Sequence, residues 1–141
     1  FAAAARTIIF VSGWMHHGEM AIDGGAVRIR QHGVPKFVKR VAEVTFNGPL
    51  ALKARKKVFY VTPVGVFRLT DRGMELTSVM PGIDVRKDIV KTTPMRVVLP
   101  RSGQVAVISR SVVTGDGFTC PQTASGLAVR TRGARGERIG G

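Results

Sequence analysis

Three short apolar runs follow one another in the middle of the chain, and they constrain the fold more than any other feature. They cover residues 58–61, 66–69 and 74–79. Proline and glycine at positions 63 and 65 separate the first two runs, and the sequence Asp71-Arg72-Gly73 separates the last two. Short runs divided by such turn residues predict three β-strands, the last two joined as a hairpin.

An unbroken apolar run near the start of the chain predicts another strand. Residues 8–11 read IIFV and end at Ser12-Gly13. A strand without polar alternation is typical of burial on both faces, as in parallel or mixed α/β sheets. Residues 25–33, GAVRIRQHG, instead alternate apolar residues with arginine, which predicts a half-exposed strand.

A defined corner follows the predicted hairpin. Pro81-Gly82 breaks the chain, and Asp84 offers a side-chain oxygen as the N-cap of a helix that we expect to reach about Thr92. From about residue 119 the chain is rich in glycine and arginine without an apolar period, which predicts disorder. The remaining predicted strands are residues 41–46, ahead of a turn at Asn47-Gly48, and residues 97–99 and 105–108.

The chain is strongly basic. It has 22 lysine and arginine residues against 9 acidic ones, a net charge of +13, and a field of that sign attracts phosphates and carboxylates. Nucleic-acid binding is the simplest interpretation. However, the sequence has no zinc-finger, RNP or basic-zipper spacing, and its aromatic residues do not alternate with the basic ones.

Cysteine content and the start of the chain bear on its compartment. Cys120 is the one cysteine, so no internal disulfide can form, and a reducing compartment such as the cytoplasm is expected. Arg6 interrupts the first apolar stretch, so we expect no membrane span. A chain that opens on Phe1 is expected to be part of a longer protein.

The hairpin and the corner together carry a family resemblance. The pattern KVFYVT, VFRLT, GMELTSV and PGIDVRKDI resembles the C-terminal part of family I coenzyme A transferases, the acetate/propionate and 3-oxoacid enzymes. The family has a lysine-led strand, an A-V-F-x-L strand, a turn with glycine, an L-x-L strand, and P-G-I-D before a helix. The matching positions are Lys57–Thr62, Val66–Leu69, Gly73, Met74–Leu76 and Pro81–Asp84, with weaker matches at Lys36–Val38 and Val44–Gly48.

This resemblance covers roughly residues 8 to 92, and it implies both fold and chemistry. The implied fold is α/β, a partial three-layer domain of the CoA-transferase type with a mixed sheet, a β-hairpin and a short C-terminal helix. The implied activity moves coenzyme A between a short-chain acyl-CoA and a carboxylic acid. In the family a glutamate attacks the thioester and passes through a glutamyl-CoA thioester.

No catalytic residue is assigned to this chain. The nucleophile's E-x-G motif and the glycine-rich CoA loop precede the matched segment in the family, so the isolated chain is expected to be inactive. Glu19 follows Gly18 but lacks the next glycine of that motif, and Glu43 and Glu75 are interpreted as solvated charges.

The candidate substrate-binding residues lie after the first predicted strand. Ligands of open α/β sheets bind beyond the carboxyl ends of strands, so a histidine pair there could meet a phosphate or a carboxylate. The family has small residues in this loop, and the sequence WMHHGE departs from that pattern. No metal site is expected, since adjacent histidines point apart on an extended chain. The candidates are Ser12, Gly13, His16, His17 and Gly18.

Two readings of the whole chain follow. In the first, residues 1–115 are the C-terminal part of a CoA-transferase catalytic domain and residues 116–141 are a disordered tail. Its partners would be acyl-CoA, a small carboxylate and the upstream part of the enzyme, with a homo-oligomer when complete. Coenzyme A would be a substrate, with no bound cofactor, no membrane and no nucleic acid. The alternative is a non-enzymatic module that binds anions or nucleic acid.

Overall fold

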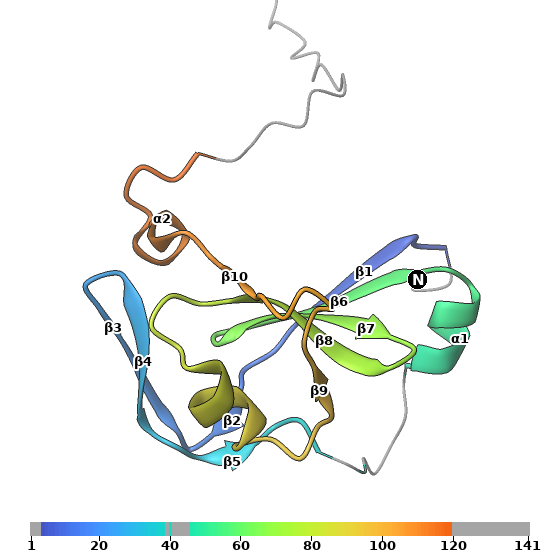
Figure 1. Ribbon diagram of the computed structural model, residues 1–141, viewed down its shortest axis with the longest axis horizontal. Coiled ribbons are helices and arrows are strands. Elements are labelled where there is room, and N and C mark those ends of the chain that lie inside the picture. Colours follow the sequence, from blue (N-terminus) through green and yellow to red (C-terminus); the bar gives the residue numbers. More distant parts are fainter. Residues whose placement is uncertain (1–3, 39, 41–45, 120–141) are drawn as a thin grey trace, which may run out of the picture.

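The computed structural model describes residues 4–38, 40 and 46–119, and it is built around one mixed sheet (Figure 1). The sheet runs in the order β1, β6, β7 and β8, and two short strands, β9 and β10, both pair with β8. β1 is parallel to β6, whereas β6, β7 and β8 are antiparallel neighbours. The strands are β1 Thr7–Val11, β6 Lys57–Thr62, β7 Gly65–Thr70, β8 Gly73–Val79, β9 Val97–Val98 and β10 Ala106–Val107.

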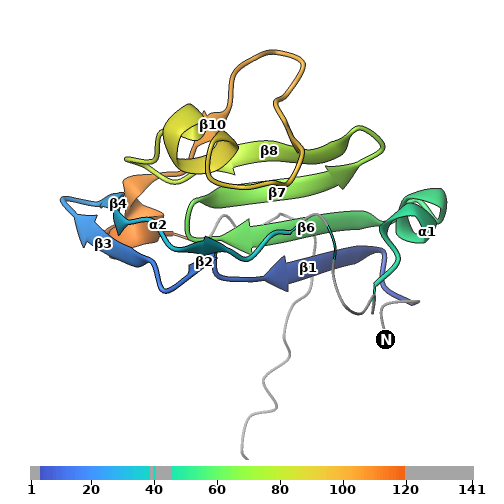
Figure 2. The same cartoon turned by 90° about the horizontal axis from the view of Figure 1, so that it is seen from below.

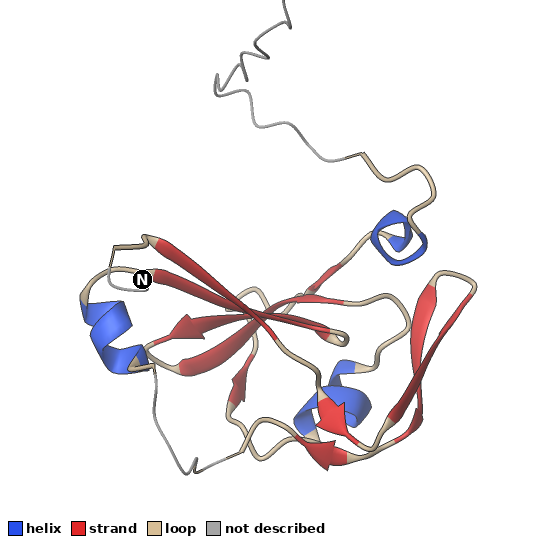
Figure 3. Cartoon of the chain, turned by 180° about the vertical axis from the view of Figure 1, so that it is seen from behind, coloured by secondary structure: helices blue, strands red, loops and turns tan. Residues whose placement is uncertain are grey.

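Two smaller sheets and three short helices complete the described residues. The hairpin of β3 and β4 lies to one side of the main sheet, and α1 lies at the other side (Figure 3). The elements are β2 Met15–His16, β3 Glu19–Asp23, β4 Ala26–Gln31, β5 Val34–Pro35, α1 Gly48–Lys53, η1 Val85–Val90 and α2 Arg110–Thr114. This arrangement confirms the predicted α/β class with a mixed sheet and a hairpin.

The predicted burial of the first strand is wrong. β1 forms at residues 7–11 as expected, but its side chains alternate between half-buried and exposed. Ile9 is 61% exposed and Val11 is 82% exposed. An unbroken apolar run indicates burial only when both faces of the sheet have a neighbour. Within the described residues, only one face of β1 is covered.

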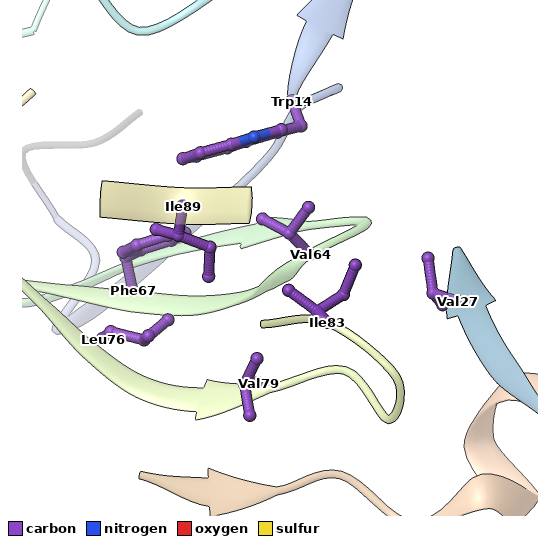
Figure 4. Close-up of a cluster of buried hydrophobic side chains, with 8 residues drawn as sticks. All are labelled: Trp14, Val27, Val64, Phe67, Leu76, Val79, Ile83 and Ile89. Atoms are coloured by element: carbon purple, nitrogen blue, oxygen red, sulfur yellow. The ribbon is translucent and has the colours of Figure 1, made fainter. Parts of the chain in front are cut away.

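The core lies on that covered face. The Trp14 ring stacks on Phe67 with 5.6 Å between the ring centroids, and Ile89 of η1 is fully buried beside them (Figure 4). Phe37 packs against both aromatic rings. The buried apolar cluster comprises Trp14, Val27, Val64, Phe67, Leu76, Val79, Ile83 and Ile89. The three antiparallel strands β6, β7 and β8 and the corner after them therefore share one core.

The corner forms as predicted, with a different helix type. The Asp84 side chain accepts a hydrogen bond from the Lys87 amide at 2.7 Å and caps the helix. The helix η1 is a π-helix of six residues, and its cap at Lys91 donates to the Arg86 carbonyl. Pro81 accepts a 2.7 Å hydrogen bond from Val27, so the corner is fixed against β4.

Several elements differ from the prediction or lie outside it. The Asn47-Gly48 turn is instead a helix start, because the Asn47 side chain caps α1 by accepting from the Leu50 amide. β3, α1 and α2 were not predicted. Residues 41–45 of one predicted strand, and the predicted tail from residue 120 with Cys120, lie outside the described residues. The domain boundary at residue 115 stays a prediction.

Candidate functional site

The candidate loop leaves the carboxyl end of β1. The Ser12 amide donates to the Val61 carbonyl at 3.0 Å and so continues the pairing of β1 with β6. The Lys36 side chain packs closely over Gly13. A Cβ atom at position 13 would come within 2.9 Å of the Lys36 ammonium, so glycine leaves room for this contact. The next residue, Trp14, turns into the core. The loop therefore begins on a rigid strand and is anchored by a buried indole.

The middle of the loop is a close backbone crossing. Gly33 allows this crossing, because a side chain there would collide with the backbone at His16 and His17 and with the amide of Gly18. The Gly33 amide donates to the Met15 sulfur at 3.0 Å. Met15 and His16 also pair with Pro35 and Val34. Gly18 is thus a packing position in this structure.

His16 and His17 lie side by side on the exposed surface of the loop. Their ring centroids are 6.3 Å apart, and His17 adopts a left-handed backbone conformation with φ of 53°. Both rings can reach a ligand from solvent, and their separation lets them contact two atoms of one anion. Substrate binding by Ser12, Gly13, His16, His17 and Gly18 remains a prediction.

Asp88 joins the candidate loop to the corner, and sequence reasoning missed it. Its carbonyl accepts a hydrogen bond from the Trp14 indole at 3.2 Å. Its carboxylate accepts from the Asp84 amide at 2.9 Å and lies 3.8 Å from the His32 imidazole. Asp88 lies four residues after the N-cap, one position beyond the usual capping-box spacing, and its contacts with Trp14 and His32 depend on tertiary structure.

Two of the hollows on the described surface are well defined, and none of the five predicted site residues lines either of these two. One, of about 540 Å³, is apolar and lies between the β3–β4 hairpin and α2. Its lining is Met20, Ala21, Ile22, Val27, Pro63, Met80, Val112 and Val113. The other, of about 390 Å³, is lined by Arg68, Thr70, Asp71, Arg72, Glu75 and Arg101.

The second hollow, which we call the arginine hollow, lies at the tip of the β7–β8 hairpin. Glu75 is largely buried there and pairs with Arg68 at 2.8 Å and with Arg72 at 3.5 Å. The lining carries three arginines against the two carboxylates of Asp71 and Glu75, which leaves a small excess of positive charge. The interpretation of Glu75 as a solvated charge is wrong, because it is the internal counter-ion of this cluster.

The other two glutamates do not change the catalytic assignment. Glu19 is exposed at the start of β3, and Glu43 lies outside the described residues. Among the residues the structure describes, no group of three or more His, Cys, Asp or Glu side chains is arranged to hold a metal ion. In the same residues, no helix has the length and apolar character that a bilayer crossing requires.

Known proteins give consistent matches. No family model matches the sequence. The acetate CoA-transferase YdiF of Escherichia coli K12 is 31% identical over 126 residues, which is 87% of this chain and 24% of that protein. The caffeate CoA-transferase of Acetobacterium woodii is 32% identical over 88 residues, covering 62% of this chain and 17% of that protein.

Solved structures agree with the sequence matches. The crystal structure of the acyl-CoA transferase YdiF apoenzyme from E. coli O157:H7 superposes with a TM-score of 0.76 and 28% identity, over 86% of this chain and 24% of that one. The thioester complex of the same enzyme with CoA gives a TM-score of 0.74 at 30% identity, over the same shares of the two chains. The chain spans about a quarter of the length of the curated acetate CoA-transferases it matches.

Proposed function

We propose that this chain, a relative of the coenzyme A transferases, supplies one segment of an enzyme that moves coenzyme A between a short-chain acyl-CoA and a carboxylic acid. The observation that carries the proposal is the match of 86% of the chain, at a TM-score of 0.76, to a solved acyl-CoA transferase. The segment contributes the hairpin, the corner and the loop after β1, and the nucleophile lies in the rest of the enzyme.

The chemistry is covalent catalysis in two exchanges. A glutamate carboxylate attacks the acyl-CoA thioester, the CoA thiolate leaves, and an acyl-glutamyl anhydride forms. The thiolate then attacks the glutamyl carbonyl, which releases the donor's carboxylate and leaves a glutamyl-CoA thioester. An acceptor carboxylate reverses these steps. Coenzyme A is thus a substrate, and the reaction needs no bound cofactor.

The role of the described residues is binding and support. The loop with Ser12, Gly13, His16, His17 and Gly18 lies beyond the carboxyl end of β1, where α/β proteins commonly bind ligands. The exposed imidazoles of His16 and His17 would contact the phosphates of CoA or the acceptor carboxylate. Trp14 and Asp88 hold the loop against the corner.

The same proposal includes a compartment, a metabolic role and an oligomeric state for the complete enzyme. The complete enzyme would act in the cytoplasm, in short-chain fatty acid or ketone body metabolism, and would assemble as a homo-oligomer. The isolated chain would be inactive because its described residues include no glutamate in the family's nucleophile context.

The proposal is tested with a chimera. The matching quarter of the E. coli acetate CoA-transferase is replaced by this chain, and transfer from acetyl-CoA to a short carboxylate is measured for the chimera and for the chain alone. We expect activity in the chimera only. Activity in the chain alone would place the nucleophile within it, and a folded but inactive chimera would argue against the proposed function.

The predicted binding loop is tested in the same chimera. Replacing His16 and His17 together with alanine should raise the KM for acyl-CoA and leave kcat less affected, since binding contacts are lost. An unchanged KM would remove the two histidines from the binding site. Alanine at the exposed residue Asp23, at the end of β3, serves as the control.

Anion binding without catalysis is the second candidate, and the arginine hollow favours it. Arg68 and Arg72 pair with the buried Glu75 carboxylate, Arg101 and Asp71 line the same hollow, and the chain as a whole carries +13. Binding of a nucleic acid or polyphosphate at this surface would weaken steeply with salt. Such binding, together with an inactive chimera, would favour this candidate.

A further inference from the structure

The backbone of β1 has one satisfied side and one open side. The Arg6 carbonyl accepts from Lys57, and the Ser12 amide donates to Val61. Backbone groups alternate in direction along a strand, so those of Thr7, Ile9 and Val11 point away from β6. No other strand in the described part of the chain pairs there, and Figure 2 shows β1 as the last strand of the sheet. We call this side of β1 the free edge.

The free edge lacks the features by which proteins normally protect an edge strand. Natural edge strands carry lysine, proline, a bulge or an inward charge, because open backbone groups recruit other strands. β1 reads TIIFV and has none of these residues, and its pairing with β6 is regular over all five positions. A strand with these properties is suited to pair with a further strand on its free edge.

The side chains on the face beside the free edge are also apolar, and those of Ile9 and Val11 are exposed. Phe10 stacks on Tyr60 on the core face, so the alternate residues of β1 and β6 point to the opposite face. Strand pairing continues this row into β7, where Val66 lies opposite Val61. We call Ile9, Val11, Phe59, Val61 and Val66 the open face; the first two are exposed and the other three are half-buried. An apolar patch beside an unprotected edge marks an interaction surface.

The opposite edge of the sheet, at β8, is protected within the chain, and we call it the finished edge. There β9 and β10 each pair with only two residues of β8, so no long open strand remains. The Ile108 amide donates to the Val79 carbonyl, and Val107 points its backbone away from β8 by the same alternation. Edges as short as these recruit strands poorly.

We propose that the free edge and the open face dock the remaining part of the transferase, which adds a strand to β1 and covers Ile9 and Val11. The proposal rests on the proposed function, because it takes this chain to be one segment of that enzyme. The size of the relatives favours this occupant: about three-quarters of the acetate CoA-transferase lies outside the match. Binding of a second copy of the chain is the competing outcome.

The test follows amide hydrogen exchange in the chain alone and in the chimera with the E. coli enzyme. The peptide covering residues 7–11 should exchange at least about tenfold more slowly in the chimera, because a new strand accepts or donates at Thr7, Ile9 and Val11. The peptide containing Val107 should change little. Equal exchange of the 7–11 peptide in both proteins would overturn the proposal.

A matched pair of proline variants tests the same surface by stability. Ile9 and Val107 each point their amide away from a neighbour within the chain, and they are 61% and 66% exposed. Proline is tolerated at such edge positions. Ile9→Pro should lower the melting temperature of the chimera much more than Val107→Pro does, and the two should have similar effects in the chain alone.

The remaining outcomes separate this proposal from the proposed function. A chimera that protects residues 7–11 but transfers no coenzyme A would support docking and contradict the function. An active chimera with an unprotected 7–11 peptide would do the reverse. A chimera that does not fold would count against docking, as would a dimer of the chain alone in which residues 7–11 are already protected.

Discussion

The two edges of the main sheet differ in how far this chain completes them. At one edge, β8 leads directly into the capped corner at Asp84 and is covered along part of its length by β9 and β10. At the other edge, β1 presents a regular apolar strand whose outer side has no neighbour among the described residues. The first edge depends only on contacts within the chain, whereas the second has the form of an interface.

The same contrast separates the two faces of the sheet. One face carries the Trp14 and Phe67 stack and the helix η1, and the opposite face carries Ile9 and Val11 in solvent. Burial on the first face should therefore provide the stability of the isolated chain. The open face should contribute only when another part of the enzyme covers it.

The largest expected effect comes from the covered face. Ile89→Ala removes a fully buried side chain and should lower the free energy of unfolding by about 2–5 kcal/mol. Ile9→Ala should cost no more than about 0.5 kcal/mol in the chain alone, since that side chain is already in solvent. Chemical denaturation measures both, and equal losses would remove the distinction between the two faces.

The corner at the finished edge should show the next largest effect. Asp84→Ala removes the acceptor of the Lys87 amide at the start of η1 and should cost about 1 kcal/mol. Asp84→Asn keeps an acceptor and should restore most of the loss. If the asparagine variant is as unstable as the alanine variant in thermal unfolding, the cap is not what fixes this corner.

Tyr60 of β6, whose ring stacks on Phe10 and packs against the core, gives a pH prediction. Burial raises the pKa of Tyr60 from its ordinary value of 10.0. Because the unfolded chain loses this proton first, the stabilising contribution is complete below pH 10.0 and is lost as pH rises through the higher folded pKa.

Tyr60 is the one tyrosine of the chain, so tyrosinate absorbance reports its titration directly. The difference in unfolding free energy between the natural chain and Tyr60→Phe should change in this alkaline range. Docking of another segment over β1 should raise the pKa of Tyr60 further if it adds to burial. A midpoint at or below the ordinary value would contradict the burial of this side chain.

The smallest effect is expected from the ion pair at the border of the open face. Arg68 lies in the same cross-strand row as Ile9 and Phe59 and pairs with Glu75 on β8. Since Arg68 is about half exposed, a double-mutant cycle with Arg68→Met and Glu75→Gln should give a coupling of about 0.2–1 kcal/mol that falls with added salt. A much larger coupling would mean that this end of the sheet is more enclosed than the structure indicates.

The sequence predicted the local features of this protein well. The hairpin residues 57–79 and the cap at Asp84 follow from turn chemistry and short apolar runs, which act over a few residues. The helix α1 was missed because Asn47-Gly48 is equally suited to a turn, and only the Asn47 contact with Leu50 distinguishes the two. The exposure of Ile9 and Val11 could not be predicted, since it depends on which neighbours β1 has.

The candidate loop illustrates the same limit. Ser12 and Gly13 lie where a strand-to-loop transition was expected, but nothing local indicates that Trp14 turns inward to reach the Asp88 carbonyl. Gly18 and Gly33 come together through pairing of β2 with β5, segments too short to leave a periodic signal. Long-range contacts of this kind decide which loop residues remain accessible to a ligand.

Amide exchange resolved by residue in the isolated chain tests the central claim most directly. Directly after β1 the Ser12 amide is bonded to Val61, whereas the amides of Ile9 and Val11 within the strand point to the free edge. We expect Ser12 to exchange slowly and Ile9 and Val11 to exchange almost as fast as in an unfolded peptide. Slow exchange at all three amides would contradict the account, because β1 would then already have a partner on its outer side.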